Sequence, residues 1–242
     1  MLSQLDQDGR PIINGQLQFK QEIFQLLVND TGPSLRAMKR SILIPLFLLP
    51  LTLLAGEGFV SLFDGETFDG WKISEENSDS WVIEDGALVT RGPRAHIFYV
   101  GELAPFKNFE LKVDVKTKNG SNGGIYFHTA YQAEGWPLVG LECQVNVSQG
   151  DWKKTGSLYD IANIGFCFLQ DDTWWTQHII VEGKTVTVKL NGITVLQYKE
   201  PPGAEAGDPF TRLLDEGTIG LQCHDPGSEV HYRNIRIKRL PD

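Results

Sequence analysis

The sequence predicts an all-β protein, a two-sheet antiparallel jelly-roll sandwich. Three observations lead to this class. From residue 59 onward, about a dozen short segments have the alternation or the β-branched and aromatic residues of strands, and Gly-rich turns separate them. No segment beyond residue 56 keeps a helical period for more than a turn or two. No repeat of about 20–50 residues is present, which excludes a propeller or a solenoid.

One hairpin and one strictly alternating strand define the first half of the predicted domain. Asp85-Gly86 is a two-residue turn that predicts a hairpin between residues 81–84 and 87–90. Residues 109–116 alternate apolar and charged side chains, which predicts a strand with one buried face. Residues 118–124, rich in Gly and Asn, predict a turn. Further strands are expected over residues 59–63, 96–100 and 125–129.

The second half contains the strongest turn signal of the chain, Asn191-Gly192. It predicts that residues 185–190 pair with residues 193–198. The other strands are expected over residues 139–147, 174–182, 217–224 and 230–240, with residues 156–161 as a further segment. Because the ends of a sandwich need edge partners, the first and last strands are expected to pair.

Residues 139–147 have an unusual polar face. Alternation places Leu141, Cys143, Val145 and Val147 on one side, and Glu142, Gln144 and Asn146 on the other. A carboxylate and two amides in a row are suited to hydrogen bonding with a polyhydroxylated ligand. The alternative is an ordinary solvent-exposed sheet face.

The N-terminal part is interpreted as a leader rather than as part of the fold. Residues 38–55 combine a basic start, a short apolar run and small residues, which is typical of a secretory signal peptide. Residues 1–37 are then expected to be an over-extended start, and residues 56–242 the single exported domain, periplasmic or extracellular. The alternative is a cytoplasmic lead before an uncleaved signal anchor.

The charge and cysteine content exclude some classes of partner. Removal of residues 1–55 takes away five Lys or Arg and four Asp or Glu, so the formal net charge changes from −9 to −10. An acidic domain of this kind is a poor candidate for nucleic acid or for an anionic membrane surface after signal cleavage. Cys143, Cys167 and Cys223 allow either one disulfide with one free thiol or three free thiols. Cys143 is expected to pack in the core.

A series of short motifs occurs in order across residues 59–239. They are Leu62-Phe63-Asp64-Gly65, Gly70-Trp71, Trp81-x-Ile83-Glu84-Asp85-Gly86-Ala87-Leu88, Asn108-Phe109-Glu110-Leu111, Ser121-Asn122-Gly123-Gly124-Ile125, Gly140-Leu141-Glu142-Cys143-Gln144, Thr155-Gly156-Ser157-Leu158-Tyr159-Asp160, Leu190-Asn191-Gly192, Gly220-Leu221-Gln222 and Val230-x-Tyr232-Arg233-Asn234-Ile235-Arg236-Ile237. Taken together they resemble the 3-keto-disaccharide hydrolase domain family, formerly domain of unknown function 1080. The resemblance implies a concanavalin-A-like fold and hydrolysis of 3-keto-glycosides in exported bacterial proteins.

That implied reaction requires particular catalytic groups in the site. A ketone at C3 of a sugar makes the C2 proton acidic, so a base can remove it, the C1 substituent can leave and water can add back. The site then needs a general base, a donor or cation for the enolate oxygen, and an acid for the leaving group. The substrate would come from a sugar 3-dehydrogenase acting upstream.

Three residues are the catalytic candidates. Glu142 is the first candidate base, with a structural carboxylate as the alternative. His128 is the second, because Ile125 and Phe127 are expected to be buried, which leaves His128 facing the same way as Tyr126. Asp160 could be the acid partner or a turn cap. A divalent metal could be held by the three candidates together, but no ligand spacing requires one.

Substrate binding is expected from a second set of residues. For Asn122 the alternative to substrate binding is a role in a turn, and His224 with Asp225 could likewise begin a turn. Trp174 and Trp175 are adjacent in a strand and point oppositely, so at most one of them can face a ligand. The binding candidates are Asn122, Gln144, Asn146, Trp152, Tyr159, Trp175 and His224.

Two other functions compete with a 3-keto-glycoside hydrolase. One is a non-catalytic carbohydrate-binding module that uses the amide-rich face as a lectin site. The other is an ordinary β-glucanase, which is disfavoured because residues 142–147 lack the Glu-x-Asp-x-x-Glu pattern of such enzymes.

Overall fold

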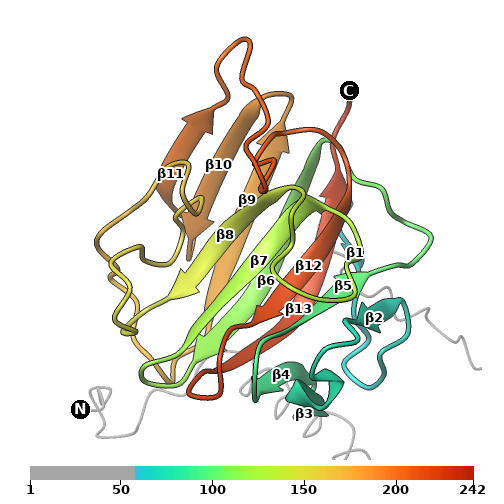
Figure 1. Cartoon of the computed structure of the whole chain (residues 1–242), viewed down its shortest axis with the longest axis vertical. Coiled ribbons are helices and arrows are strands. Elements are labelled where there is room, and N and C mark those ends of the chain that lie inside the picture. Colours follow the sequence, from blue (N-terminus) through green and yellow to red (C-terminus); the bar gives the residue numbers. More distant parts are fainter. Residues whose placement is uncertain (1–57) are drawn as a thin grey trace, which may run out of the picture. The chain divides into compact units, whose positions relative to one another are not determined.

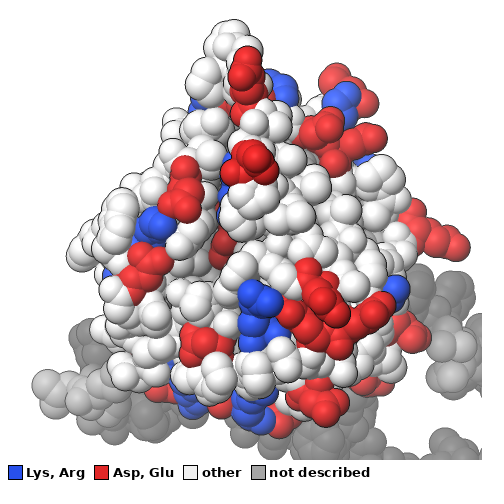
Figure 2. All heavy atoms as spheres, viewed as in Figure 1, with Lys and Arg blue, Asp and Glu red and all other residues white. Residues whose placement is uncertain are grey.

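The computed structural model of the chain describes residues 58–242. The predicted leader segments, residues 1–37 and 38–55, lie outside the described residues. Within the described part the chain forms two antiparallel sheets, with one 3-10 turn at Ser78–Ser80 (Figure 1). In this part, no helix is long and apolar enough to cross a membrane. Acidic side chains are spread over the face shown in Figure 2, with basic ones interspersed and no continuous basic area among them.

The larger sheet has eight strands in the order β11-β10-β9-β6-β13-β4-β3, with β1 beside β13. The pairing of Val60 in β1 with Ile237 in β13 confirms that the first and last strands are partners. The predicted hairpin turns are also present, with positive φ at Asp85 and at Asn191. The strands are β1 Val60–Ser61, β3 Trp81–Glu84, β4 Ala87–Arg91, β6 Phe109–Thr117, β9 Trp175–Glu182, β10 Thr185–Leu190, β11 Ile193–Lys199 and β13 Glu229–Arg239.

The smaller sheet has five strands in the order β2-β5-β12-β7-β8. The predicted turn over residues 118–124 is too long, because β7 already begins at Asn122 and its Gly123 pairs with Val145. Residues 156–161 form no named strand, although Leu158 makes isolated bridges to Cys143 and Ala162. The strands are β2 Trp71–Ile73, β5 Ala95–Tyr99, β7 Asn122–Thr129, β8 Leu141–Asn146 and β12 Thr218–Cys223.

The core lies between the two sheets. In β6, Phe109, Leu111, Val113 and Val115 are fully buried and alternate with half-exposed charged residues, as the sequence predicts. Cys143 packs in the core, where its sulfur accepts a hydrogen bond from Nε2 of Gln177 (3.0 Å). All three cysteines are free thiols. The inner faces of both sheets therefore pack mainly apolar side chains against one another.

The smaller sheet is also buried on its outer face, the face directed away from the core. Every residue of β8 is buried. The free edge of β8 is covered because Gln144 exchanges backbone hydrogen bonds with Gly156 and Ser157, and the Tyr159 amide donates to the Glu142 carbonyl (2.9 Å). The loops of residues 130–140, 147–174 and 200–217 supply side chains over this face. The predicted polar row of β8 is therefore covered rather than solvent-exposed.

Gly140 permits the entry into β8, and this can be tested. Its φ is +89°, and an added Cβ would lie 2.4 Å from the Phe127 carbonyl oxygen. We expect Gly140→Ala to cost at least about 2 kcal/mol, because a left-handed conformation and a backbone clash combine. The thermal unfolding midpoint should fall by roughly 4 °C or more. The control is Gly150→Ala, where no atom lies within 4 Å; an equal loss in both variants would contradict the expectation.

Candidate functional site

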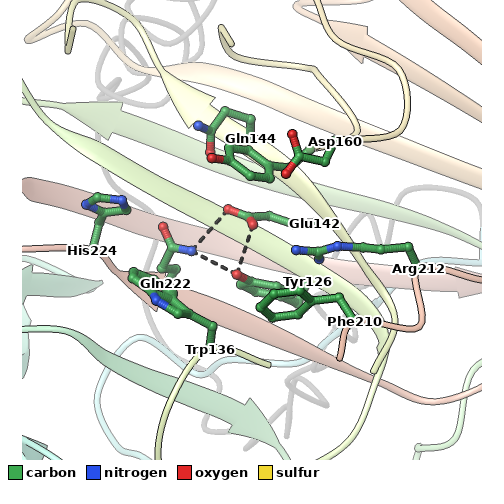
Figure 3. Close-up of a pocket in the computed structure, with 10 residues that line it drawn as sticks. Tyr126, Trp136, Glu142, Gln144, Asp160, Phe210, Arg212, Gln222 and His224 are labelled. Atoms are coloured by element: carbon green, nitrogen blue, oxygen red, sulfur yellow. Dashed lines mark hydrogen bonds between the residues drawn. The ribbon is translucent and has the colours of Figure 1, made fainter. Parts of the chain in front are cut away.

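A cavity of about 340 Å³, lined by both polar and aromatic side chains, lies over the outer face of the smaller sheet (Figure 3). Strands β7, β8 and β12 supply its floor, and the three covering loops supply its walls. The residues that line it are Tyr126, Trp136, Glu142, Gln144, Tyr159, Asp160, Phe210, Arg212, Gln222 and His224.

Strand register brings the floor residues together. Tyr126 in β7 is the register partner of Glu142 in β8. On its other side, Tyr126 is the register partner of Gly220 in β12, and Gln222 lies two residues further along that strand. Partners in an antiparallel pair project from the same face, and alternate residues share that face. The apolar residues between them face the core, so the same alternation builds the core and the cavity floor.

Glu142 is at the centre of a hydrogen-bond network. The Tyr126 hydroxyl donates to Oε2 (2.9 Å), and Nε2 of Gln222 donates to Oε1 (3.0 Å) and to the Tyr126 oxygen (2.9 Å). The Gln144 amide is satisfied with its nitrogen towards Glu142, donating to Oε1 (3.3 Å) and to the Gly123 carbonyl (2.9 Å). Glu142 is 5% exposed. Burial raises the pKa of Glu142 despite these hydrogen bonds, which makes its carboxylate a stronger base than a solvated one.

Gly124 leaves the space that this carboxylate occupies. A Cβ at Gly124 would lie 2.4 Å from Oε1 of Glu142. The glycine pair at residues 123–124, which the sequence suggests as turn chemistry, is therefore needed in the strand itself. Only a glycine allows the side chain of Glu142 to lie over β7.

Arg212 faces Glu142 across the cavity (Figure 3). Its Nη1 is buried and has no hydrogen-bond partner among the described residues. The loop that carries it is fixed at two points: the Thr211 amide donates to the Leu138 carbonyl (2.9 Å), and the Leu214 amide donates to Oε2 of Glu200 (2.6 Å). A buried guanidinium nitrogen without a partner is costly, and it is available to an acceptor on a ligand.

Two further polar groups beside the network also lack partners within residues 58–242. One is Oε1 of Gln222, a hydrogen-bond acceptor. The other is the ring of His96, whose two nitrogens are both unpaired and which packs edge-on against Tyr126 (5.7 Å) and Trp136 (5.6 Å). Burial lowers the pKa of His96 to about 3, so the ring is neutral. Gln222 and Arg212 thus leave an acceptor and a donor on opposite sides of Glu142.

Asp160 and Tyr159 form one rim of the cavity. Asp160 is ion-paired with Lys153 (2.7 Å), and its side chain is 59% exposed. The Lys153 ammonium also lies 3.8 Å from the centre of the Tyr159 ring. His224, at another point of the lining, packs against Trp136 with ring centres 5.3 Å apart. The structure therefore brings five of the predicted residues to one cavity: Glu142, Gln144, Tyr159, Asp160 and His224.

The expectation that His128 faces the same way as Tyr126 is wrong. A register shift lies opposite, in β12 between Thr218 and Gly220, and His128 has a φ of +52°. This bulge turns the ring between Phe109 and Phe127 (centres 5.7 and 5.6 Å away). Its Nε2 donates to the Lys107 carbonyl (2.9 Å) and its Nδ1 accepts the Asp215 amide (3.1 Å).

The metal grouping of His128, Glu142 and Asp160 consequently does not form, because His128 is absent from the cavity lining. In the described part of the chain, no group of three or more His, Cys, Asp or Glu side chains is arranged to hold a metal ion.

Four predicted binding residues do not line the cavity. Asn146 holds the loop after β8, since its Nδ2 donates to the carbonyls of Asp151 (2.9 Å) and Lys153 (3.0 Å). Asn122 is its buried register partner. Trp175 is the buried member of the Trp pair, and its indole donates to Gln177 (3.3 Å) in the core. Trp152 is 60% exposed and lies outside the lining.

Sequence reasoning did not select five of the lining residues: Tyr126, Trp136, Phe210, Arg212 and Gln222. Gln222 had a signal, because it is a lone amide between Leu221 and Cys223 in an apolar strand. Tyr126 had one too, as the alternate neighbour of buried residues. Trp136, Phe210 and Arg212 come from irregular loops, where no periodicity assigns a direction to a side chain.

Comparison with known proteins agrees with this architecture. A family model described as the 3-keto-alpha-glucoside-1,2-lyase-like domain matches residues 58–238. A protein of Bacteroides thetaiotaomicron named 3-keto-disaccharide hydrolase is 28% identical over 231 residues, covering 76% of this chain and 79% of that protein.

Solved structures share the fold. A crystal structure of a candidate glycosyl hydrolase from Parabacteroides distasonis superimposes with a TM-score of 0.65 at 24% identity, covering 76% of this chain and 95% of that one. The carbohydrate-binding module CBM66 from Bacillus subtilis gives a TM-score of 0.51 at 15% identity, covering 70% and 95%. These likenesses confirm the predicted jelly-roll sandwich.

The buried charge of Glu142 should reduce stability. Because burial raises its pKa, the ionised side chain disfavours folding at neutral pH, and Glu142→Gln removes the charge while keeping the shape. We expect Glu142→Gln to raise the unfolding midpoint by a few degrees, at roughly 2–4 °C per kcal/mol. Glu229→Gln is the matched control: hydrogen bonds from Arg91 lower the pKa of Glu229 to about 2, so this variant should be less stable. A lower midpoint for both variants would contradict the interpretation of Glu142.

His96 predicts a loss of stability in mild acid. An unfolded histidine takes up a proton near pH 6.5, whereas the pKa of buried His96 is about 3, so stability falls as the pH drops from about 6.5 towards 3. The slope from this group is roughly 1.4 kcal/mol per pH unit. Midpoints of His96→Phe, measured between pH 7.5 and pH 4, should fall less steeply than those of the unsubstituted protein. Parallel curves would show that His96 does not carry the effect.

Proposed function

This chain belongs to the 3-keto-alpha-glucoside-1,2-lyase-like family, and we propose that it cleaves 3-keto-glycosides, sugars in which C3 carries a ketone. The match of the family model to residues 58–238 confirms the family resemblance of the motifs. The observation that carries the proposed activity is the buried carboxylate of Glu142, facing the unpaired guanidinium of Arg212 across the cavity. The cavity, of about 340 Å³, is at the lower end of the range usual for small-molecule sites, ~300–1,000 Å³.

Glu142 is proposed as the base that removes the C2 proton. The electron pair of the C2–H bond moves to form C2=C3, which places negative charge on the C3 oxygen. When that charge returns, C1=C2 forms and the C1–O bond breaks, which releases the aglycone. Water then adds to C1, and Glu142 returns a proton to C2, so the net reaction is hydrolysis. Its raised pKa brings Glu142 closer to the neutral range in which a general base is most effective.

Arg212 supplies the complement to that base. Nη1 of Arg212 is a donor without a partner among the described residues, and a ketone oxygen is an acceptor that gains charge during the reaction. A donor already in place for that charge lowers the barrier without reorganisation. Tyr126 and Gln222 hold the Glu142 carboxylate in one orientation through their hydrogen bonds.

The remaining lining residues fit the rest of a sugar ring. Oε1 of Gln222 can accept a hydrogen bond from the C2 hydroxyl group, and Gln144 is a further amide on the floor. Trp136 and Phe210 are aromatic walls suited to the C–H face of a pyranose. Tyr159 and Asp160 contact the substrate at the rim.

An ordinary glycosidase mechanism has less support from this site. Such enzymes use two carboxyl groups that flank the scissile bond. Of the lining residues, only Glu142 and Asp160 carry carboxyl groups, and Asp160 is neutralised by Lys153 at the exposed rim. The proposed chemistry needs one base and one cation instead. Its substrate must be supplied by a sugar 3-dehydrogenase, and export through residues 38–55 stays a prediction.

A paired set of substrates tests the function. We expect the protein to cleave methyl 3-keto-glucoside or 3-keto-trehalose and to leave the unoxidised counterparts intact. Glu142→Gln should lower kcat/KM about 10²–10⁴-fold and Arg212→Ala about 10²–10³-fold. Trp152→Ala, a change at an exposed residue outside the cavity, should have no effect.

Three other outcomes would contradict this proposal, each in a different way. Binding of the keto-sugars without turnover would identify a carbohydrate-binding module. Equal cleavage of unoxidised sugars would indicate an ordinary glycosidase. Turnover that survives Glu142→Gln would place the chemistry elsewhere.

A further inference from the structure

His224 is held by a carboxylate that is itself fixed. Nδ1 of His224 lies 2.6 Å from Oδ2 of Asp225. The Gly227 amide donates to Oδ1 of Asp225 (2.8 Å), and the Ser228 hydroxyl donates to Oδ2 (2.9 Å). Ser228 in turn accepts the Asn122 amide at the start of β7 (2.9 Å). The pair His224–Asp225 is thus tied to the frame of the smaller sheet.

This arrangement fixes the tautomer and the position of the imidazole. Because Nδ1 donates to Asp225, Nε2 is the nitrogen left to exchange a proton with a ligand. Among the described residues, no hydrogen bond occupies Nε2 of His224. The ring packs against Trp136 at 5.3 Å, and Trp136 is itself held by Arg94, whose guanidinium carbon is 4.9 Å from the indole centre. The ring of His224 therefore has a defined place in the cavity lining.

The order of groups across the cavity places His224 at one end. Figure 3 shows Arg212 on one side of Glu142, and Gln222 followed by His224 on the other. With the C3 oxygen at Arg212, the C2 proton at Glu142 and the C2 hydroxyl at Gln222, the C1 substituent lies towards His224. The sequence of groups matches the sequence of atoms C3, C2 and C1 in the sugar.

We propose that His224 is the acid that protonates the leaving group, with Asp225 as its positioning residue; this inference rests on the proposed function. As the C1–O bond breaks, the Nε2 proton of the imidazolium passes to the departing oxygen, which becomes a neutral alcohol. Neutral His224 then accepts a proton from the water that adds to C1, and Glu142, after its carboxyl proton has exchanged with water, returns a proton to C2. Each group ends in its starting state.

The sequence makes Asp160 a candidate acid, but the structure places Asp160 at the exposed rim of the cavity. It is paired with Lys153 at 2.7 Å and is largely exposed, so its carboxylate already has a cationic partner at the rim of the cavity. His224 has a carboxylate partner on one nitrogen and a free second nitrogen, the arrangement by which an imidazole transfers protons.

A comparison of leaving groups tests the role of His224. The probes are 4-nitrophenyl 3-keto-glucoside, whose aglycone leaves without protonation, and methyl 3-keto-glucoside, whose aglycone needs a proton. We expect His224→Gln to lower kcat/KM on the methyl glycoside about 10²–10⁴-fold and on the nitrophenyl glycoside less than about 10-fold. Asp225→Asn should show the same contrast in smaller degree, and should also change the pH profile of methyl glycoside cleavage.

His178→Gln is the control, because His178 makes a similar contact with Glu110 (3.0 Å) on the larger sheet and lies outside the cavity. It should leave both rates unchanged. Equal losses on the two aglycones in folded His224→Gln, or in Asp225→Asn if the first variant does not fold, would overturn the assignment of His224 while leaving the proposed function intact. No cleavage of either glycoside by the unsubstituted protein would overturn both.

Discussion

The burial of one carboxylate, Glu142, is the constraint on which the rest of the site depends. A buried anion needs donors, and Tyr126 supplies one from the adjacent strand β7 and Gln222 another from β12, the next strand along. It needs space, which Gly124 leaves. No cation forms an ion pair with it in the described part of the chain, so its pKa stays raised and its proton affinity is kept. A buried anion of this kind lowers stability, and such costs are commonly found where a protein performs chemistry.

The two sheets divide the tasks of the domain. Their inner faces form the apolar core, while the outer face of the smaller sheet carries the polar side chains of the cavity floor. Three loops supply side chains over that face and leave Glu142 buried, which strengthens electrostatic interactions around its carboxylate. The loop of residues 200–217 brings Arg212 opposite Glu142 and is anchored near that residue, at Thr211 and Leu214. Paired strands hold Glu142, the proposed base, and an anchored loop holds Arg212.

Alternation along strands could be predicted from the sequence, and with it Glu142, Gln144 and the burial of Cys143. The same rule failed at His128, because a residue with positive φ changes the side-chain direction, and alternation in the sequence does not show where such a residue lies. It also could not separate Gln144, which reaches the cavity, from Asn146, which holds a loop. Arg212 and Trp136 could not be predicted as cavity residues from the sequence, because their positions depend on contacts between distant segments.

In the proposed reaction, Glu142 removes the C2 proton of a 3-keto-glycoside. The most direct measurement is cleavage of methyl 3-keto-glucoside in D₂O, with the first released sugar analysed by NMR or mass spectrometry. Because water must enter the cavity to add to C1, the carboxyl proton of Glu142 exchanges with solvent before C2 is reprotonated. If Glu142 removes the C2 proton, the earliest product therefore carries deuterium at C2, at a level well above that of a blank without protein. Retention of the original proton at C2 during rapid cleavage would contradict its removal by Glu142, because direct displacement at C1 never breaks the C2–H bond.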